Sequence, residues 1–317
     1  MTGHAMAALR ERRITLIGLG NQGRGQAMNL KATGLQVDVA LRENSPNRAD
    51  AARIGAPVVP LEAAAQNADL LVFLIPDEVQ GALWREVIAP RLKPGAGLIF
   101  AHGFSVHFGH VTPPADSDVM LVSPKGAGAN MRYREACSWG VHQDASGRAT
   151  ETAQAYARAI VGPDARLIGT SFEEEAVSDL FGEQVSLCGG VPAMMRMAFE
   201  TLVEGGVSPE MAYFDVVQEI KLISDLIAAK GLAGMYEAVS DTAEFGAYRT
   251  GPRLANEAMR AEMQAILKDI KSGRFAADWV EEAESGRPAV MERRAANQAH
   301  PIEAAGRAAR KEEARET

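Results

Sequence analysis

The chain of 317 residues has a formal net charge of −8 and is 47% hydrophobic and 23% charged. This length suggests two domains that each bury a core, and the composition is that of a soluble globular protein. The acidic balance argues against nucleic acid as the main partner, because phosphate binding needs clustered Lys and Arg. Two cysteines, Cys137 and Cys188, cannot build a disulfide framework and fit a reducing compartment.

Targeting and membrane signals are missing from the residues themselves. The longest apolar run, at 70–75, is far too short to span a bilayer, and residues 1–13 hold no apolar stretch of signal-peptide length. We therefore expect a cytoplasmic protein with no membrane partner.

The first half of the chain alternates apolar runs with helical stretches. Five runs have strand character: 14–18, 36–41, 69–75, 97–101 and 119–122. Three Ala-rich or amphipathic segments lie between them: 22–32, 47–54 and 79–88. Strands that alternate with helices predict βαβ units on a Rossmann-type, doubly wound parallel sheet. Continuous apolar strands fit a sheet that is covered on both faces.

Strand signals stop after about residue 170, and helical periodicity takes over. Five helical segments with breaks at Gly or Pro follow: 173–187, 191–204, 209–229, 252–271 and 275–283. We predict a dinucleotide-binding domain over 1–170 and an all-α domain over 171–306. Residues 307–317 form a charged tail that is expected to fray.

The segment from Gly18 to Gly23 reads GxGxxG and lies between a predicted strand and a predicted helix. Gly18 and Gly20 allow a tight turn and a close approach of the backbone to a pyrophosphate. The helix N-terminus supplies N–H groups and a positive dipole for the phosphates. Strand, spacing and helix agree, so we expect a bound dinucleotide; the alternative is a plain glycine turn.

The end of the second predicted strand indicates which dinucleotide binds. Arg42 stands where an NAD-preferring enzyme is expected to place an acidic residue, and Ser45 follows closely. Guanidinium and hydroxyl donors suit a 2′-phosphate, so we expect NADP(H). Glu43 keeps NAD open as the alternative.

Two pairs of carboxylates have i, i+4 spacing, Asp179 with Glu183 and Asp215 with Glu219. The members of each pair project from one face of a helix, and their neighbours in sequence are unusually apolar. If the two helices face each other, four carboxylates converge. That arrangement needs cations, and oxygen ligands favour Mg²⁺. One such pair alone is a weak signal, because helix surfaces carry many.

Six motifs resemble signatures of the ketol-acid reductoisomerase family and stand in that family's order. They are FAHGF at 100–104, PKG at 124–126, SDLFGEQ at 178–184, LCGG at 187–190, PEMAYF at 209–214 and TAEFG at 242–246. The similarity runs from about Ile14 to the segment 300–303, and the SDLFGEQ block is highly specific. The chain length, with one set of C-terminal helices, resembles the short class of the family.

The resemblance implies conversion of 2-acetolactate-type 2-hydroxy-2-alkyl-3-oxo acids to 2,3-dihydroxy acids in branched-chain amino-acid biosynthesis. An alkyl migration that needs Mg²⁺ comes first, and NADPH then reduces the resulting 2-oxo acid. The resemblance further implies two Mg²⁺ and a homodimer, or a higher assembly of dimers, in which the all-α domain intertwines with that of a partner subunit.

Site residues follow from the same resemblance, position by position. The implied catalytic residues are His102, Lys125 and Glu183, with His102 near the nicotinamide. The implied metal ligands are Asp179, Glu183, Asp215 and Glu219, and Ser240 is the implied substrate contact from the partner subunit. The implied cofactor contacts are Gly18, Leu19, Gly20, Asn21, Gln22, Gly23, Arg42, Ser45, Asp77, Gln80 and Gly128.

The chain also departs from the family's pattern. Asp215 stands where the family usually has Glu, and Gln218 where it has His. The loop between Lys125 and Gln143 is shorter and has no Gly-rich segment, and the usual aromatic and acidic lead-in before the first strand is missing. These changes leave open a divergent paralogue, either an NADP-dependent 2-oxo acid reductase or an enzyme for a different substrate. A non-catalytic dinucleotide-binding regulator is a third hypothesis, against which the four carboxylates and the histidine count.

Overall fold

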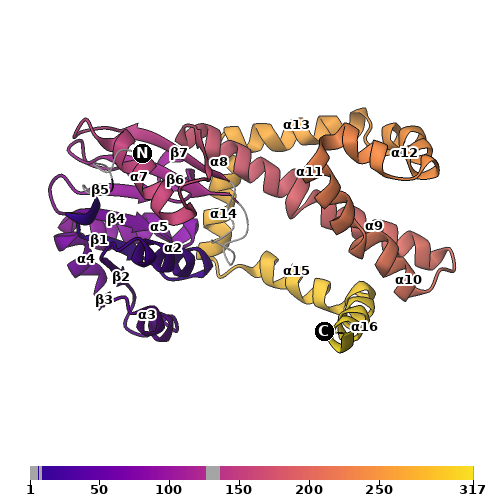
Figure 1. Cartoon of the computed structure of the whole chain (residues 1–317), viewed down its shortest axis with the longest axis horizontal. Coiled ribbons are helices and arrows are strands. Elements are labelled where there is room, and N and C mark those ends of the chain that lie inside the picture. The colour runs from indigo at the N-terminus through magenta and orange to yellow at the C-terminus, as the bar shows by residue number, and fades with distance from the viewer. Residues whose placement is uncertain (1–5, 7–8, 126–135, 317) are drawn as a thin grey trace. The chain divides into compact units, whose positions relative to one another are not determined.

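The computed structural model describes residues 6, 9–125 and 136–316 of the chain. Two compact units are present, Met1–Ser178 and Asp179–Thr317, the first an α/β unit and the second all-helical (Figure 1). Gly128 and most of the shortened loop after Lys125 lie outside the described residues.

Within the described residues, the first unit holds an eight-stranded sheet in the order β3-β2-β1-β4-β5-β6-β7-β8. The strands are β1 (Ile14–Ile17), β2 (Val37–Ala40), β3 (Val58–Val59), β4 (Leu70–Phe73), β5 (Gly97–Phe100), β6 (Val119–Pro124), β7 (Ala136–Gln143) and β8 (Arg166–Gly169). The doubly wound α/β prediction is confirmed. One correction applies, because β7 runs antiparallel to β6. The joining segment, 125–135, is too short for the dozen or so residues that a parallel crossover needs.

Three strands were not expected from the sequence, and each lacks a continuous apolar run. β3 and β8 are the two edge strands of the sheet and are largely accessible to solvent. β7 mixes apolar residues with Ser, Gly and His, and only part of its residues are buried. A half-covered strand needs no unbroken apolar run, so the pattern that revealed the central strands is absent here.

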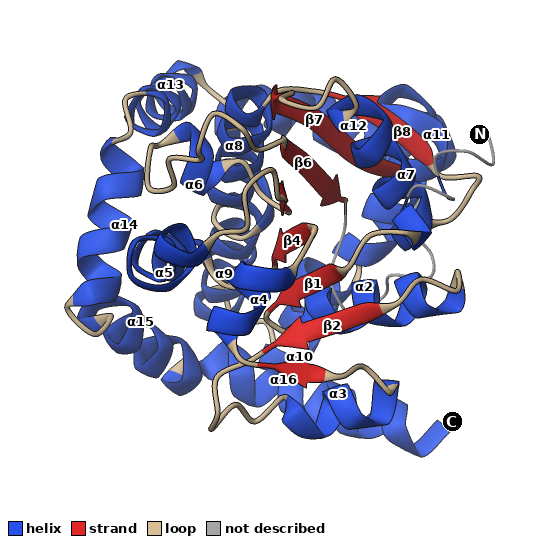
Figure 2. Ribbon diagram, turned by 90° about the vertical axis from the view of Figure 1, so that its left-hand side faces the viewer, coloured by secondary structure: helices blue, strands red, loops and turns tan. Residues whose placement is uncertain are grey.

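Helices cover both faces of the sheet (Figure 2). One face carries α2 (Asn21–Ala32), α3 (Arg48–Ile54) and α7 (Ala149–Val161). The other carries α4 (Leu61–Asn67), α5 (Asp77–Leu83), the π-helical turn η1 (Trp84–Ile88), the short η2 (Ala89–Arg91) and α6 (Phe104–His107). Buried Tyr156 of α7 donates a hydrogen bond to Oε1 of Gln26 at 2.7 Å, which ties α7 to α2. Burial raises the pKa of Tyr156 well above its ordinary value of 10.0, so the hydroxyl remains a donor.

The remaining elements are helical. They are α8 (Phe172–Phe181), η4 (Gly182–Leu187), α9 (Gly190–Glu204), α10 (Pro209–Tyr213), η5 (Phe214–Gln218), α11 (Ile220–Ala238), α12 (Asp241–Leu254), α13 (Glu257–Lys271), α14 (Arg274–Glu284), α15 (Pro288–Ala299) and α16 (Pro301–Glu316). Every helix of the described residues is too short or too polar to cross a membrane.

Two sequence expectations for these helices need correction. The segment 173–187 is α8 followed by a π-helical turn and not one α-helix. Pro252 does not begin a helix but lies inside α12, and α13 begins at Glu257. There Asn256 caps the helix by accepting a hydrogen bond from the Met259 N–H at 3.1 Å. Residues 307–316, predicted as a charged tail, belong to α16.

Candidate active site

The loop after β1 has the conformation that a dinucleotide pyrophosphate needs. Gly18 has a φ of +96°, and a Cβ there would lie 2.8 Å from the carbonyl oxygen of Leu74. A Cβ on Gly23 would lie 2.7 Å from the carbonyl oxygen of Gly18, so only glycine lets α2 pack on this turn. At Gly20 no described atom lies within 4 Å of the Cβ position, so the backbone is open to a ligand. These glycines fit a dinucleotide.

The N-terminus of α2 strengthens this fit. Among the described side chains none caps the helix, and its first turn contains no acidic residue. Its N–H groups and positive dipole are therefore available to a phosphate. The strand order reverses between β2-β1 and β4, which places the loop at the switch point of the sheet, where such folds bind ligands. Leu19 is 1% exposed, so its backbone and not its side chain can contact the cofactor.

The turn after β2 carries two guanidinium groups. Arg42 and Arg48 are both exposed, and a guanidinium nitrogen of Arg48 lies 3.5 Å from the carbonyl oxygen of Arg42. Ser45 Oγ accepts a hydrogen bond from the Asn47 N–H at 3.3 Å, which shapes the turn. Arg48 was not singled out from the sequence, because it stands inside the predicted helix.

Asp77, His102 and Lys125 follow the carboxyl ends of three adjacent strands, β4, β5 and β6. The Nδ1 atom of His102 lies 2.8 Å from a carboxylate oxygen of Asp77. Asp77 was expected as a cofactor contact, and in this structure its carboxylate faces the imidazole. Gln80 Nε2 donates to the Ile75 carbonyl oxygen at 2.9 Å and lies 3.1 Å from Oδ1 of Asp77, so it holds the start of α5.

Glu175 of α8 is a second site residue that the sequence did not reveal. Its side chain is 2% exposed, and its carboxylate accepts hydrogen bonds from the Gly103 N–H at 2.7 Å and from Lys125 Nζ at 3.2 Å. His102 Nε2 lies 4.0 Å from Oε2 of the same carboxylate. A Cβ on Gly103 would lie 2.3 Å from the carbonyl oxygen of Phe172, so glycine permits this close approach. Glu175 stands last in a run of three Glu that looked like a solvated first turn.

Each of the two carboxylate pairs has one member on a π-helical turn. Asp179 is in α8 and Glu183 in η4, while Asp215 is in η5 and Glu219 follows it directly. The wider turns are closed by i→i+5 hydrogen bonds, from Cys188 N–H to the Glu183 carbonyl at 2.8 Å and from Glu219 N–H to the Phe214 carbonyl at 3.1 Å. Such turns occur frequently at functional sites. Both η4 and η5 pack against α9.

The surroundings of these carboxylates differ from the sequence expectation. Asp179 is half-buried, whereas Glu183, Asp215 and Glu219 are exposed, although their apolar neighbours in sequence suggested a core position. Within the described part of the single chain, no three His, Cys, Asp or Glu side chains are grouped so as to hold a metal ion. The four carboxylates therefore do not converge in one copy of the chain.

Models of one protein family match both halves of the chain. Residues 8–165 match a family model described as the NADPH-binding domain of acetohydroxy acid isomeroreductase. Residues 172–314 match the C-terminal domain of ketol-acid reductoisomerase. The chain belongs to the ketol-acid reductoisomerase family. It is thus an NAD(P)-dependent oxidoreductase and isomerase by family and fold.

Solved structures agree with this family. An NADH-preferring ketol-acid reductoisomerase from an uncultured archean is 38% identical, with a TM-score of 0.92 over 96% of each chain. More distant matches share the fold alone. An NAD-binding semialdehyde dehydrogenase protein from Cupriavidus necator is 20% identical, with a TM-score of 0.65 over 82% of this chain and 99% of that one. A pyrroline-5-carboxylate reductase from Coxiella burnetii is 16% identical, with a TM-score of 0.58 over 82% and 98%.

The two glycines of the LCGG motif, Gly189 and Gly190, are required by the packing of α9 against the π-helical turn η4. A Cβ on Gly189 would lie 1.8 Å from the carbonyl oxygen of Gln184, and a Cβ on Gly190 would lie 2.0 Å from that of Val185. The two glycines let α9 begin directly against the carbonyl groups of η4. The turn that carries Glu183 thus depends on glycines that follow it.

Ser240 lies at the N-terminus of α12 and is exposed. Its Oγ accepts a hydrogen bond from the Ala243 N–H at 3.3 Å. The hydroxyl proton is not used by that bond and can be donated to a ligand. Ser240 therefore remains the predicted substrate contact.

Proposed function

We propose that this family member is an Mg²⁺-dependent, NADPH-using ketol-acid reductoisomerase that converts 2-acetolactate-type 2-hydroxy-2-alkyl-3-oxo acids to 2,3-dihydroxy acids. The observation that carries the proposal is the network in which Glu175 binds Lys125 and Gly103 while Asp77 holds His102. This network lies at the carboxyl edge of the sheet, the same edge as the open glycine loop. A buried carboxylate paired with a cation is typical of a site organised for catalysis.

The carboxylates Asp179, Glu183, Asp215 and Glu219 would hold the metal. Carboxylate oxygens are the ligands that Mg²⁺ prefers, and solvent access to three of the four allows the ion to keep some of its waters. Mg²⁺ would supply Lewis-acid polarisation of the substrate's hydroxyl and carbonyl oxygens. These residues fit Mg²⁺ by the chemistry of their oxygen ligands. Among the described residues of one chain, however, they are not brought together into a metal site.

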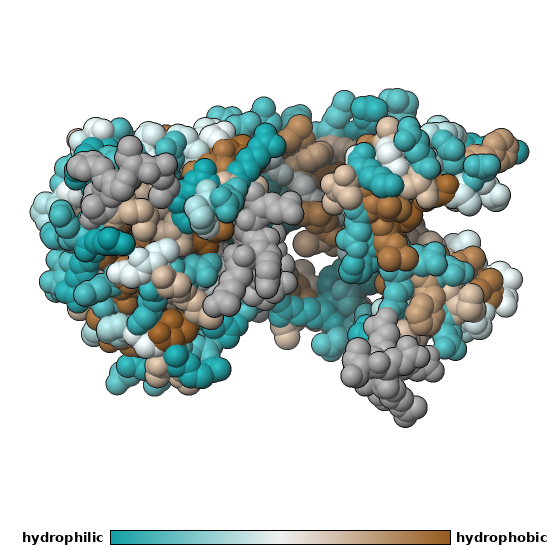
Figure 3. All heavy atoms as spheres, viewed as in Figure 1, coloured by the Kyte–Doolittle hydropathy of each residue, from teal (hydrophilic) through white to brown (hydrophobic). Residues whose placement is uncertain are grey.

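A second copy of the chain would complete the metal site. Large apolar side chains are exposed on the helical unit, and Figure 3 shows brown areas on the face of this unit that it draws. They include Leu187, Met194, Met211, Leu222, Leu232 and Phe245. Exposed apolar area of this extent is typical of a surface that another subunit covers. A homodimer, alone or within a larger assembly, is therefore part of the proposal.

The residues of the first unit would manage charge and protons. Because Nδ1 of His102 faces the Asp77 carboxylate, the proton is favoured on Nδ1, and the imidazole would exchange a proton with a substrate oxygen. Lys125 would place positive charge beside the oxygen on which negative charge develops, and Glu175 holds that ammonium in position. NADPH would supply the hydride for the reduction. The same oxygen-binding residues can serve both the migration and the reduction.

NADPH is proposed over NADH because of the turn after β2. Arg42 and Arg48 provide guanidinium donors and Ser45 a hydroxyl, all suited to a 2′-phosphate. A relative that is 38% identical prefers NADH, so the preference needs a direct measurement. We expect kcat/KM to be higher with NADPH, and we expect Arg42→Gln to lower that preference.

The decisive experiment supplies the full chain with Mg²⁺, NADPH and 2-acetolactate and measures NADPH oxidation together with the product. Turnover to the 2,3-dihydroxy acid that stops on chelation is expected. Glu183→Gln should abolish that reaction and leave NADPH binding unchanged, while Glu204→Gln, an exposed carboxylate of α9, should behave as the parent. Reduction of the migrated 2-oxo acid alone, surviving chelation, would identify a plain 2-oxo acid reductase. Absence of turnover with either substrate would overturn both assignments.

A further inference from the structure

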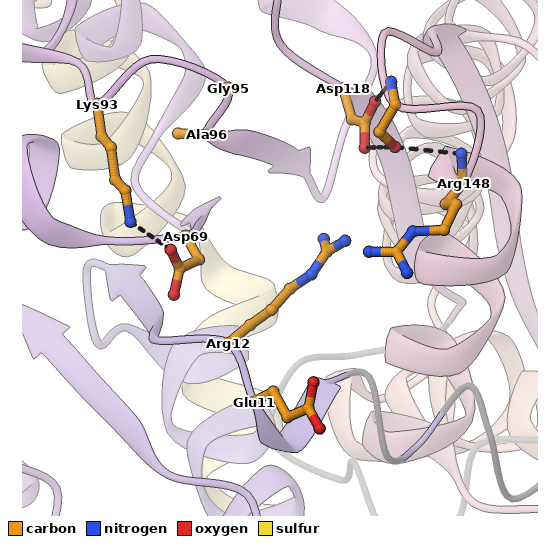
Figure 4. A pocket seen from close by; sticks show the side chains of 9 residues that line it. Glu11, Arg12, Asp69, Lys93, Gly95, Ala96, Asp118 and Arg148 are labelled. Atoms are coloured by element: carbon orange, nitrogen blue, oxygen red, sulfur yellow. Dashed lines mark hydrogen bonds and ion pairs between the residues drawn. The ribbon is translucent and has the colours of Figure 1, made fainter.

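The amino edge of the sheet holds a charged pocket of about 420 Å³ (Figure 4). Residues that precede β1, β4, β5 and β6 line it, together with the turn between β7 and α7. The glycine loop and His102 follow the carboxyl ends of β1 and β5, so they lie at the opposite edge of the same sheet. The pocket is therefore separate from the site described above.

The aspartates of this pocket already have hydrogen-bond donors. Asp69 accepts from Lys93 Nζ at 2.5 Å and from the Arg13 N–H at 2.8 Å. Burial raises the pKa of Asp69, but these hydrogen bonds and the charges of Lys93 and Arg12 outweigh it and lower the pKa from its ordinary value of 3.8. Asp118 accepts from the backbone N–H of Ser146 at 2.9 Å and from its hydroxyl at 2.7 Å. Both carboxylates are thus held in the pocket wall.

Two arginines of the pocket are placed differently. Figure 4 shows the side chains of Arg12 and Arg148 pointing toward one another, while the carboxylate of Glu11 points away from both. The charge of Arg12 also acts on Asp69, whose carboxylate accepts its hydrogen bonds from Lys93 and the Arg13 N–H. Arg148 is also the residue before α7, and its N–H is held by the hydroxyl of Ser146 at 3.1 Å. Two guanidinium groups that point toward one another favour binding of an anion between them.

We propose that this pocket binds a phosphate group, as inorganic phosphate or as a small phosphate monoester, between Arg12 and Arg148. Each planar guanidinium offers two parallel N–H donors, and a phosphate has enough oxygens to accept from both at once. A volume of 420 Å³ exceeds what a phosphate alone fills and leaves room for the organic part of an ester.

The test uses the full chain saturated with its preferred dinucleotide, so that added phosphate cannot occupy the glycine loop. Inorganic phosphate and glycerol 3-phosphate are titrated separately by isothermal calorimetry. One site per chain is expected. Arg12→Gln and Arg148→Gln should each weaken binding by about tenfold or more, since each removes a charge-assisted, bidentate contact. Arg10→Gln, an exposed arginine of the same segment outside the pocket lining, is the matched control and should bind as the parent.

Arg148→Lys provides a second measurement if a Gln variant fails to fold. It retains the charge but loses the planar fork, so binding should fall between the parent and Arg148→Gln. Equal affinity for the two ligands would show that the phosphate alone is recognised, and tighter binding of the ester would show that its organic part is bound too. The proposal is overturned if the parent shows no saturable binding at millimolar concentrations, if both Gln variants bind as the parent does, or if malonate binds more tightly than either phosphate ligand.

Discussion

A carboxylate oxygen of Asp77 lies 2.8 Å from Nδ1 of His102, which links the loop after β4 to the end of β5. The Asp77 side chain is 26% exposed and the His102 side chain 17%, so water competes only weakly for the contact. Asp77 also begins α5, beside the strand-order reversal where the dinucleotide is expected. A residue expected to contact the cofactor therefore also orients the imidazole.

Replacing Asp77 with Asn should lower kcat by about tenfold to a hundredfold, because an amide neither orients the imidazole in the same way nor stabilises its protonated form. The measurement is kcat as a function of pH. Glu62→Gln, which removes an exposed charge from α4, is the control and should leave kcat unchanged. An Asp77→Asn enzyme with the parent's kcat and pH profile would show that the contact has no part in turnover.

Glu175→Gln should lower the free energy of unfolding by about 1–3 kcal/mol and also reduce kcat. The amide can still accept from the Gly103 N–H, but it leaves Lys125 without its buried counter-charge. The effect falls below that of a fully buried pair because the Lys125 side chain is 37% exposed. Thermal melting would be compared with Glu174→Gln, an exposed neighbour expected to change stability by less than about 0.5 kcal/mol. Equal melting temperatures for the two variants would contradict this role.

Gly190→Ala should impair the Mg²⁺-dependent reaction much more than dinucleotide binding. The added methyl group would lie 2.0 Å from the Val185 carbonyl oxygen, so α9 must move away from the turn that carries Glu183. Steady-state kinetics at several Mg²⁺ concentrations, with NADPH fluorescence as the second readout, would separate the two effects. Gly246→Ala, in a helix with no described atom within 4 Å of the Cβ position, should be neutral or stabilise by up to about 1 kcal/mol. A parent-like Mg²⁺ dependence in Gly190→Ala would refute the prediction.

Tyr156→Phe should lower the free energy of unfolding by about 1–3 kcal/mol, since it leaves Oε1 of Gln26 buried with no donor. Gln26 Nε2 has no hydrogen-bond partner among the described residues either, so both polar atoms of this buried amide would then lack a partner. Thermal unfolding followed by circular dichroism measures the change. Tyr248→Phe removes an exposed hydroxyl and serves for comparison, with a much smaller effect expected. Identical shifts in the two variants would count against the buried hydrogen bond.

The stability contributed by His110 should depend on pH. Its ring stacks on Phe104 with centroids 5.4 Å apart, and burial and the charge of Arg85 lower its pKa from 6.5 despite the opposing effect of Asp77. The folded state therefore takes up a proton less readily than the unfolded state. The contribution of His110 to the free energy of unfolding is fully present above pH 6.5. It is lost as the pH falls through the lowered pKa.

The measurement for His110 is the melting temperature of the parent relative to His110→Gln. This difference should shift in favour of the parent as pH rises from about 5 to about 7.5. A difference that stays constant over this range would show that the protonation of His110 is not linked to folding.

The central strands and the glycine turn of the first unit could be predicted from the sequence, because each depends on residues close together in the chain. Continuous apolar runs mark β1, β4 and β5, and the turn at Gly18 requires glycine whatever the rest of the chain does. The edge strand β8 could not be found this way, since a strand exposed to solvent carries no continuous apolar pattern. The family motifs indicated the chemistry, because residue types at fixed spacing can be read from the sequence without knowing how the chain packs.

Tertiary structure alone decided how the side chains meet. Glu175 is an ordinary acid in a run of three until α8 packs against Gly103 and buries it beside Lys125. The π-helical turns at the carboxylate pairs depend on hydrogen bonds between residues five apart, which side-chain periodicity does not report. The facing of Arg12 and Arg148 arises from segments far apart in the sequence that the sheet brings to one edge. Hydrophobic pattern and glycine conformation act within a few residues, whereas burial of a charge and convergence of charges exist only once distant segments are packed together.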